Sequence, residues 1–117
     1  MRVLVIDDNL DAAEMMVELM GLWGHEAHHA ADGEHAIALA CELRPAIVLL
    51  DIGLPGMDGY QVAAALRADP RTCGAKIIAV TGYGLDSDRK SARAAGCDDH
   101  LVKPVEPEAL ERVLQPL

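Results

Sequence analysis

The chain has 117 residues, 51% of them hydrophobic, and this length suits one domain that buries its apolar surface without disulfide or metal cross-links. The formal net charge of -9 argues against binding to nucleic acid or to an anionic membrane, because like charges repel. No apolar run has the length of a membrane span, and the three widely spaced cysteines (Cys41, Cys73 and Cys97) fit free thiols in a reducing cytosol. We therefore expect one cytoplasmic domain over residues 1–117.

Strand-like and helix-like patterns alternate along the chain. The aliphatic run at 2–6 predicts the first strand, and the apolar spacing at 10–23 predicts the helix that follows it. The remaining strand and helix pairs are predicted, in chain order, at 26–30 and 34–43, 46–50 and 60–68, 76–80 and 87–95, and 99–102 and 107–114. This alternation predicts an α/β domain with a doubly wound parallel sheet of five strands in the order 2-1-3-4-5 and five helices.

Residues at the ends of the predicted helices support these boundaries. Gly24 and Gly96 stand where left-handed C-terminal caps are expected, because glycine adopts that conformation without a steric penalty. Asp32 can cap the second helix, and Pro107 suits a first helical position. The connections between the elements are short, which leaves no linker that would divide the domain.

Polar side chains follow four of the five predicted strands. Asp7 and Asp8 follow the first strand, Asp51 the third, Thr81 the fourth and Lys103 the fifth. Ligands of open α/β sheets bind beyond the carboxyl ends of the strands, and the predicted order makes the first and third strands neighbours. We therefore expect the three carboxylates to converge at one site, with a hydroxyl and an ammonium group at the same edge of the sheet.

Three carboxylates at one site repel one another, which raises the pKa of at least one of them unless a cation neutralises the charge. Mg²⁺ suits such oxygen ligands, and it usually keeps several waters and binds a phosphate oxygen as well. The cluster therefore predicts a site that holds Mg²⁺ and a phosphoryl group together. Asp51 can act as the nucleophile, Lys103 can offset charge on the phosphoryl oxygens, and Thr81 can donate a hydrogen bond to the product.

Four short motifs carry a resemblance to a known family. They occupy residues 5–9 (VIDDN), 49–59 (LLDIGLPGMDG), 80–82 (VTG) and 101–104 (LVKP). In their order and spacing they resemble the receiver domains of bacterial two-component response regulators, and the resemblance covers nearly the whole chain. It implies a flavodoxin-like receiver fold and a phosphoacceptor role in a two-component phosphorelay.

The resemblance also implies a role for each acid. Asp51 would accept a phosphoryl group from a phosphohistidine. Asp8 and Asp51 would ligate Mg²⁺ together with the backbone carbonyl of Gly53, and Asp7 would assist through a water. A receiver catalyses only its own phosphorylation and dephosphorylation, so we do not expect a stand-alone enzyme.

By the same resemblance, Thr81 and Lys103 contact the phosphoryl oxygens, and Thr81 forms one half of a conformational switch. The other half is usually a Tyr or Phe of the fifth strand, where this chain has His100. Because an imidazole titrates near neutral pH, we hypothesise that His100 couples signalling to acidity. An unchanged pH dependence of the phosphoryl-state lifetime in a His100→Phe variant would contradict this hypothesis.

Three further positions gain a role from the resemblance. A cis peptide bond is expected before Pro104, since X-Pro is the one linkage at which a cis bond costs little. Gly53 and Tyr83 each lie two residues beyond a reacting residue and flank the path of an attacking water. We expect both to tune how long the phosphoryl group survives.

Among receivers, the chain most resembles those attached to the C-terminus of hybrid sensor histidine kinases. The expected partner is a sensor histidine kinase or a histidine phosphotransfer protein. A homodimer through the fourth helix, fifth strand and fifth helix is a further expected interaction, and neither nucleic acid nor a membrane is expected as a partner. A single-domain regulator and a piece of a larger kinase both remain open as alternatives.

Two other classes of protein share a sheet of this kind. A phosphatase of the haloacid dehalogenase type also places a nucleophilic Asp at a strand end, but it needs a second acid two residues later, where this chain has Gly53. A flavin-binding flavodoxin needs a phosphate loop rich in Ser, Thr and Gly after the first strand, whereas residues 8–11 here include two acids. We therefore rank both classes below the receiver.

Overall fold

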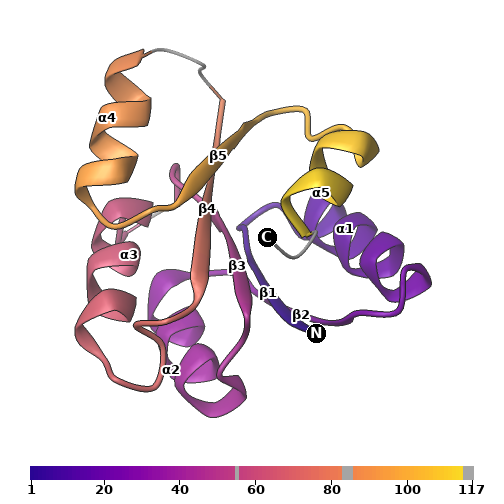
Figure 1. The fold of residues 1–117 in the computed structure, drawn as a ribbon, viewed down its shortest axis with the longest axis horizontal. Coiled ribbons are helices and arrows are strands. Elements are labelled where there is room, and N and C mark those ends of the chain that lie inside the picture. Colours follow the sequence, from indigo (N-terminus) through magenta and orange to yellow (C-terminus); the bar gives the residue numbers. More distant parts are fainter. Residues whose placement is uncertain (55, 83–85, 115–117) are drawn as a thin grey trace.

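Strands and helices alternate throughout the computed structural model, which describes residues 1–54, 56–82 and 86–114 (Figure 1). The strands are β1 (Arg2–Ile6), β2 (Glu26–Ala30), β3 (Ile47–Asp51), β4 (Lys76–Thr81) and β5 (Asp99–Val102). The helices are α1 (Leu10–Leu22), α2 (Gly33–Leu43), α3 (Gly59–Ala68), α4 (Asp86–Ala94) and α5 (Pro107–Leu114). Every boundary lies within one residue of its predicted position.

The five strands form one parallel sheet in the order β2-β1-β3-β4-β5, which confirms the predicted order. One difference affects the site. The strands β3 and β4 extend one residue beyond the ranges 46–50 and 76–80, so they include Asp51 and Thr81. Asp51 pairs with Val80, and Thr81 pairs with Val102, so the sheet itself positions both functional groups.

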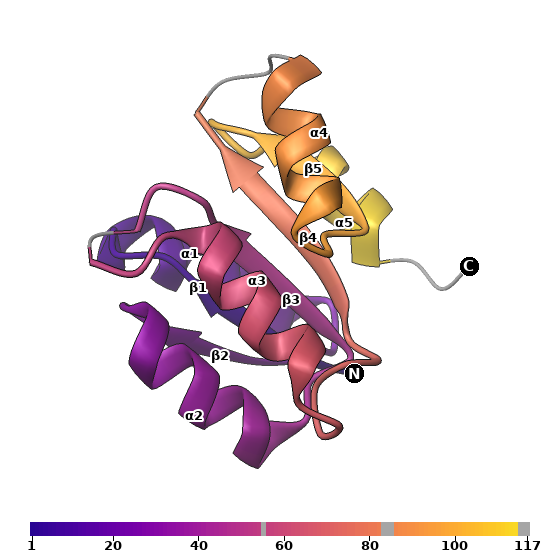
Figure 2. The same ribbon diagram turned by 90° about the vertical axis from the view of Figure 1, so that its left-hand side faces the viewer.

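Helices cover both faces of the sheet. Figures 1 and 2 show α1 and α5 on one face and α2, α3 and α4 on the other. Alternate residues of each strand enter different cores, as the side-chain period of two requires. Leu4 and Ile6 of β1 join the core under α2, α3 and α4, whereas Val3 and Val5 join the core under α1 and α5. Burial on both faces explains why these strands are almost wholly aliphatic.

Capping residues mark several helix boundaries, and the caps predicted at Asp32, Gly24 and Gly96 are confirmed. The Asp32 carboxylate accepts a hydrogen bond from the third residue of α2 and so caps that helix. Asp58 and Gln61 form a reciprocal capping box at the start of α3. Gly24 and Gly96 have φ angles of 89° and 106°, the left-handed conformation expected after α1 and α4.

The cysteines and the helix lengths bear on the expectations from composition. Cys41, Cys73 and Cys97 are free thiols, as predicted. In the described ranges, none of the helices has both the length and the apolar content needed to cross a membrane.

Candidate functional site

The carboxyl edge of the sheet carries the predicted polar side chains. Strand pairing continues to this edge, because the Asp7 amide donates to the Ala30 carbonyl at 3.1 Å and the Lys103 amide to the Thr81 carbonyl at 2.7 Å. Side chains two residues apart on a strand point to the same face of the sheet. Asp7, Asp51 and Lys103 therefore point to the face covered by α1 and α5, as do the residues two positions before them. The sheet therefore directs these three groups toward one another.

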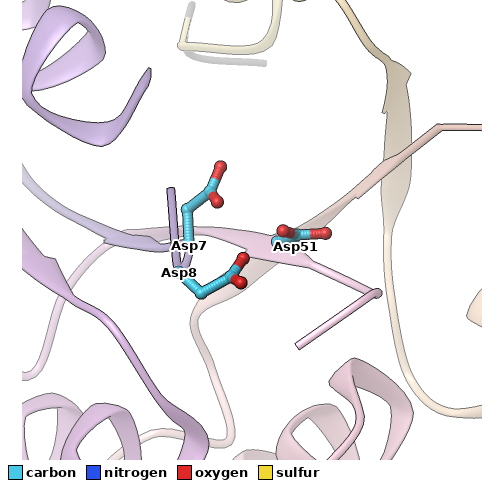
Figure 3. A group of neighbouring side chains, drawn as sticks. All are labelled: Asp7, Asp8 and Asp51. Atoms are coloured by element: carbon cyan, nitrogen blue, oxygen red, sulfur yellow. The ribbon is translucent and has the colours of Figure 1, made fainter. Parts of the chain in front are cut away.

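Three carboxylates converge at this edge, as predicted. Figure 3 shows Asp7 and Asp8 extending from the end of β1 and Asp51 from the end of β3. One carboxylate oxygen from each lies within 4.8 Å of the other two. Asp7 and Asp51 are buried, whereas Asp8 is exposed to solvent. The site is thus closed on the side of the sheet and open toward the surface.

Two donors orient the Asp51 carboxylate. The Gly53 amide donates to Oδ1 at 3.0 Å, and the Lys103 ammonium donates to Oδ2 at 3.0 Å. The same ammonium group lies 3.8 Å from Asp7 Oδ2. Lys103 therefore bridges the two buried carboxylates, which lie on neighbouring strands.

The electrostatics of the cluster follow from this arrangement. Burial raises the pKa of Asp7 above its ordinary value; the Asn9 amide and the Lys103 charge act against the rise, and the Asp51 charge adds to it. Partial burial disfavours the charged form of Lys103, but the hydrogen bond and charge of Asp51, together with the charges of Asp7 and Asp8, outweigh it, so the Lys103 pKa is raised. The ammonium group therefore stays charged at neutral pH, and this one positive charge faces three carboxyl groups.

An open cavity of about 360 Å³ lies in front of Asp51. Its volume suits a phosphoryl group with its surrounding waters. The described residues that line it come from the ends of β1, β3, β4 and β5 and from the start of α3: Asp8, Asp51, Ile52, Gly53, Tyr60, Thr81, Gly82 and Lys103. A Cβ atom at Gly82 would have no heavy atom within 4 Å, which leaves space beside Thr81.

The cavity brings together most of the predicted site residues. His100 lies outside it and lines a separate hollow of about 170 Å³ beside α4, with its Nδ1 3.9 Å from the Asp99 carboxylate. The peptide bond between Lys103 and Pro104 is cis, as expected. Tyr83 lies outside the described residues.

Three residues at the site were not predicted. Ile52 and Tyr60 line the cavity, and His29 Nε2 lies 3.1 Å from the Asp7 backbone oxygen. Ile52 and Tyr60 flank the irregular segment after β3, so their place depends on how that segment folds back. His29 belongs to β2, and only the strand order places it beside the end of β1.

The donor set fits a hard divalent cation. Carboxylate oxygens within 4.8 Å of one another are typical Mg²⁺ ligands, and the excess negative charge at the site favours a cation. The absence of sulfur and imidazole ligands from this cluster argues against a softer metal. Asp7, Asp8 and Asp51 are therefore the residues that could hold Mg²⁺.

Comparison with known proteins identifies the family. Residues 3–115 match the family model of the response regulator receiver domain. The chain belongs to this family, whose members are the phosphoacceptor domains of two-component systems. The rival interpretations as a phosphatase or a flavodoxin are thereby set aside.

Two curated relatives illustrate how the domain occurs. Protein PilH of Pseudomonas aeruginosa is 31% identical over 97% of this chain and 93% of its own length. The DNA-binding dual master transcriptional regulator RpaA of Synechocystis is 33% identical over 93% of this chain, but the chain covers only 45% of RpaA. The chain thus matches nearly all of PilH and less than half of RpaA.

Two solved structures share the fold closely. The chemotaxis protein CheY4 of Vibrio cholerae has a TM-score of 0.93 and 30% identity, with 97% of this chain and 95% of that chain covered. The receiver domain of sensor histidine kinase PA1611 from Pseudomonas aeruginosa, with a magnesium ion coordinated in its active site cleft, has a TM-score of 0.88 and 32% identity, with 97% and 93% covered. Both comparisons agree with the predicted fold class.

Proposed function

We propose that Asp51 is the phosphoacceptor of this receiver domain, taken as residues 1–117, and that its donor is a phosphohistidine of a histidine kinase or a phosphotransfer protein. The observation that carries the proposal is the position of the Asp51 carboxylate. It opens onto the cavity, accepts hydrogen bonds from Gly53 and Lys103 at 3.0 Å each, and lies within 4.8 Å of two further carboxylates. No other buried acid of the described chain lines this cavity.

The transfer is a displacement at phosphorus. A carboxylate oxygen of Asp51 forms the new P–O bond while the P–N bond to the donor imidazole breaks, and the imidazole leaves with the bonding electron pair. Negative charge on the phosphoryl oxygens is offset by the Lys103 ammonium group. Thr81, at the end of β4, donates its hydroxyl hydrogen to a phosphoryl oxygen of the product.

Asp7, Asp8, Asp51 and the backbone carbonyl of Gly53 are the groups that would hold Mg²⁺. When bound, this ion supplies positive charge that offsets the carboxylates and the phosphoryl oxygens. The raised pKa of Asp7 and the cluster of oxygen donors support the proposal. The receiver of PA1611, which has magnesium in its active site cleft, supports it by similarity.

Loss of the phosphoryl group is a hydrolysis. A water oxygen attacks phosphorus, the P–O bond to Asp51 breaks, and inorganic phosphate leaves. Gly53 and Tyr83 are proposed to set the rate of this step through access to the water. A Cβ at position 53 would lie 3.6 Å from Asp51 Oδ1, an ordinary contact distance, so a side chain at this position fits and would narrow the approach.

Phosphorylation is proposed to change the surface formed by α4, β5 and α5. Thr81 moves toward the phosphoryl group, and His100 responds on the adjacent strand, where its neighbour Leu101 pairs with Val80. The altered surface would bind a downstream partner or a second copy of the chain. The protein acts as a switch within a phosphorelay, and its catalysis is limited to its own phosphorylation and dephosphorylation.

Intact-mass measurement with a small phosphodonor such as acetyl phosphate tests the proposal. We expect the wild-type chain to gain one phosphoryl group in the presence of Mg²⁺ and none with a chelator. Asp51→Asn should gain none, whereas Asp11→Asn, which removes an exposed acid on α1, should behave as wild type. Uptake by Asp51→Asn, or none by the wild type, would refute the assignment.

A further inference from the structure

Gly59, the first residue of α3, is buried against the strand that carries Asp51. A Cβ atom at this position would lie 2.6 Å from the Ile52 Cα, 2.8 Å from the Asp51 carbonyl oxygen and 2.8 Å from the Ile52 Cδ1. Two of these three atoms belong to the backbone at the end of β3. Only glycine allows the helix to approach the strand this closely.

The backbone around Ile52 is held from both sides. Its amide donates to the Val80 carbonyl of β4 at 3.1 Å, and its carbonyl accepts from the Gly59 amide at 3.1 Å. The first turn of α3 is itself fixed by the capping box of Asp58 and Gln61. A side chain at position 59 would therefore displace this backbone, because neither β4 nor α3 can yield at low cost.

Any displacement here reaches the site directly. Ile52 lies between Asp51, whose carboxylate is the proposed phosphoacceptor, and Gly53, whose amide donates to Asp51 Oδ1 at 3.0 Å. We infer that Gly59 is a positioning residue for phosphoryl transfer: by admitting the start of α3 against the backbone of Asp51 and Ile52, it holds the Asp51 carboxylate and Gly53 in working geometry. This inference rests on the proposed function.

Gly33 provides a matched control. It is the first residue of α2 and is also buried, and a Cβ there would lie 2.9 Å from Val62 Cγ2 and 3.0 Å from Met57 Sδ. The third neighbour is Met57 Cβ at 3.1 Å, and all three atoms belong to side chains, none of them to the backbone of β3. Gly33→Ala thus adds the same methyl group in a similarly crowded place without acting on the end of β3.

The test compares Gly59→Ala with Gly33→Ala in the complete chain. The fraction folded is measured by urea denaturation, the Mg²⁺ dissociation constant by titration calorimetry, and the phosphorylation rate with acetyl phosphate per folded molecule. We expect Gly59→Ala to lose about 10- to 100-fold in rate or Mg²⁺ affinity, because small displacements of reacting groups are costly. Gly33→Ala should stay within about twofold of wild type in both.

A second variant distinguishes backbone from side-chain crowding. Adding Ile52→Val to Gly59→Ala removes the Cδ1 atom but leaves the two backbone contacts. We expect no recovery, and recovery of rate and affinity would overturn the inference. Equal effects of Gly59→Ala and Gly33→Ala per folded molecule would overturn it as well.

If Gly59→Ala does not fold, Asp58→Ala tests the same connection without adding volume, since it removes the cap that fixes the first turn of α3. We expect amide hydrogen exchange at Gly53 to accelerate in this variant, and unchanged exchange would contradict the inference. Failure of the proposed function itself is recognised separately, because the wild-type chain would then take up no phosphoryl group.

Discussion

At the carboxyl edge of the sheet, three carboxylates lie within 4.8 Å of one another beside the Lys103 ammonium group. At the amino edge, the Arg67 guanidinium donates to the carbonyls of Gly96, Cys73 and Ala75 and to the Asp98 carboxylate, at 2.6 to 2.8 Å. The Arg67 charge is paired with Asp98, and every contact joins α3 to a segment that precedes β4 or β5. Charge at the carboxyl edge is unbalanced, which costs stability but suits a site that binds a cation and a phosphoryl group.

The difference shows that the amino edge of the sheet stabilises the fold, whereas the carboxyl edge carries the reactive groups. Asp98 accepts from both Arg67 and the Ile77 amide, so the end of α3, the start of β4 and the start of β5 are joined through two side chains. Asp7 and Asp51, by contrast, share one ammonium group, that of Lys103, among the residues that the structure describes. Substitutions at the two ends should therefore change stability in opposite directions.

The largest effect is expected from Arg67→Met. This change removes the Arg67 donor from three carbonyls and leaves the Asp98 carboxylate, among the described residues, with the Ile77 amide alone. Since Arg67 is only partly exposed, we expect the free energy of unfolding to fall by about 2–3 kcal/mol. Urea denaturation measures the loss. The phosphorylation rate per folded molecule should remain within about twofold of wild type, and a large loss of rate would show that the two ends are not separate.

Thiol reactivity at the amino edge gives the second prediction. Burial raises the pKa of Cys97 to about 11, whereas Cys73 is exposed. We expect a maleimide to label Cys97 on the order of 100-fold more slowly than Cys73, because the thiolate is the reacting form and access requires opening. Peptide mass spectrometry distinguishes the two. Arg67→Met should accelerate labelling of Cys97, and no acceleration would mean that Arg67 does not hold this end closed.

Asp7→Asn is expected to stabilise the protein. The raised pKa of Asp7 means that its ionised form opposes folding at neutral pH, and the amide oxygen of Asn can still accept from the Asn9 amide. We expect the free energy of unfolding to rise by about 1 kcal/mol in metal-free buffer. Asp8→Asn, at the exposed neighbour, should change it by less than about 0.5 kcal/mol. Destabilisation by Asp7→Asn would contradict the view that the carboxyl edge is strained by charge.

The smallest effect concerns an exposed pair at the start of α2. The hydrogen bond and charge of Asp32, 2.6 Å from His35 Nδ1, raise the His35 pKa above 6.5. The stability from this pair is present below the unfolded pKa and is lost as the pH rises through the raised folded pKa. Thermal unfolding of His35→Gln and wild type should converge as the pH increases above neutrality. Asp32→Asn keeps the cap oxygen and should also remove this pH dependence.

Much of the fold could be predicted because its signals are local. Aliphatic runs define the strands, and short crossovers restrict the strand order. Asp32 begins α2 by capping it with its side chain, and the glycines after α1 and α4 end those helices in the left-handed conformation. Arg44 shows the limit of this approach. It ends α2 with a left-handed φ of 49° although it is not a glycine, so the usual end signal was absent.

Chain order and strand ends alone brought Asp7, Asp8, Asp51, Thr81 and Lys103 to one edge, since parallel strands place their carboxyl ends together. Tertiary packing decided the rest. It buried Asp7 and exposed Asp8, and it placed Tyr60 in the cavity and His100 outside it. It also set Gly59 against the backbone of Ile52 and brought Gly96 and Asp98, about 30 residues away in sequence, to Arg67. Such contacts depend on how the helices pack against the sheet. They join residues that are far apart in sequence, so no local periodicity or motif predicts them.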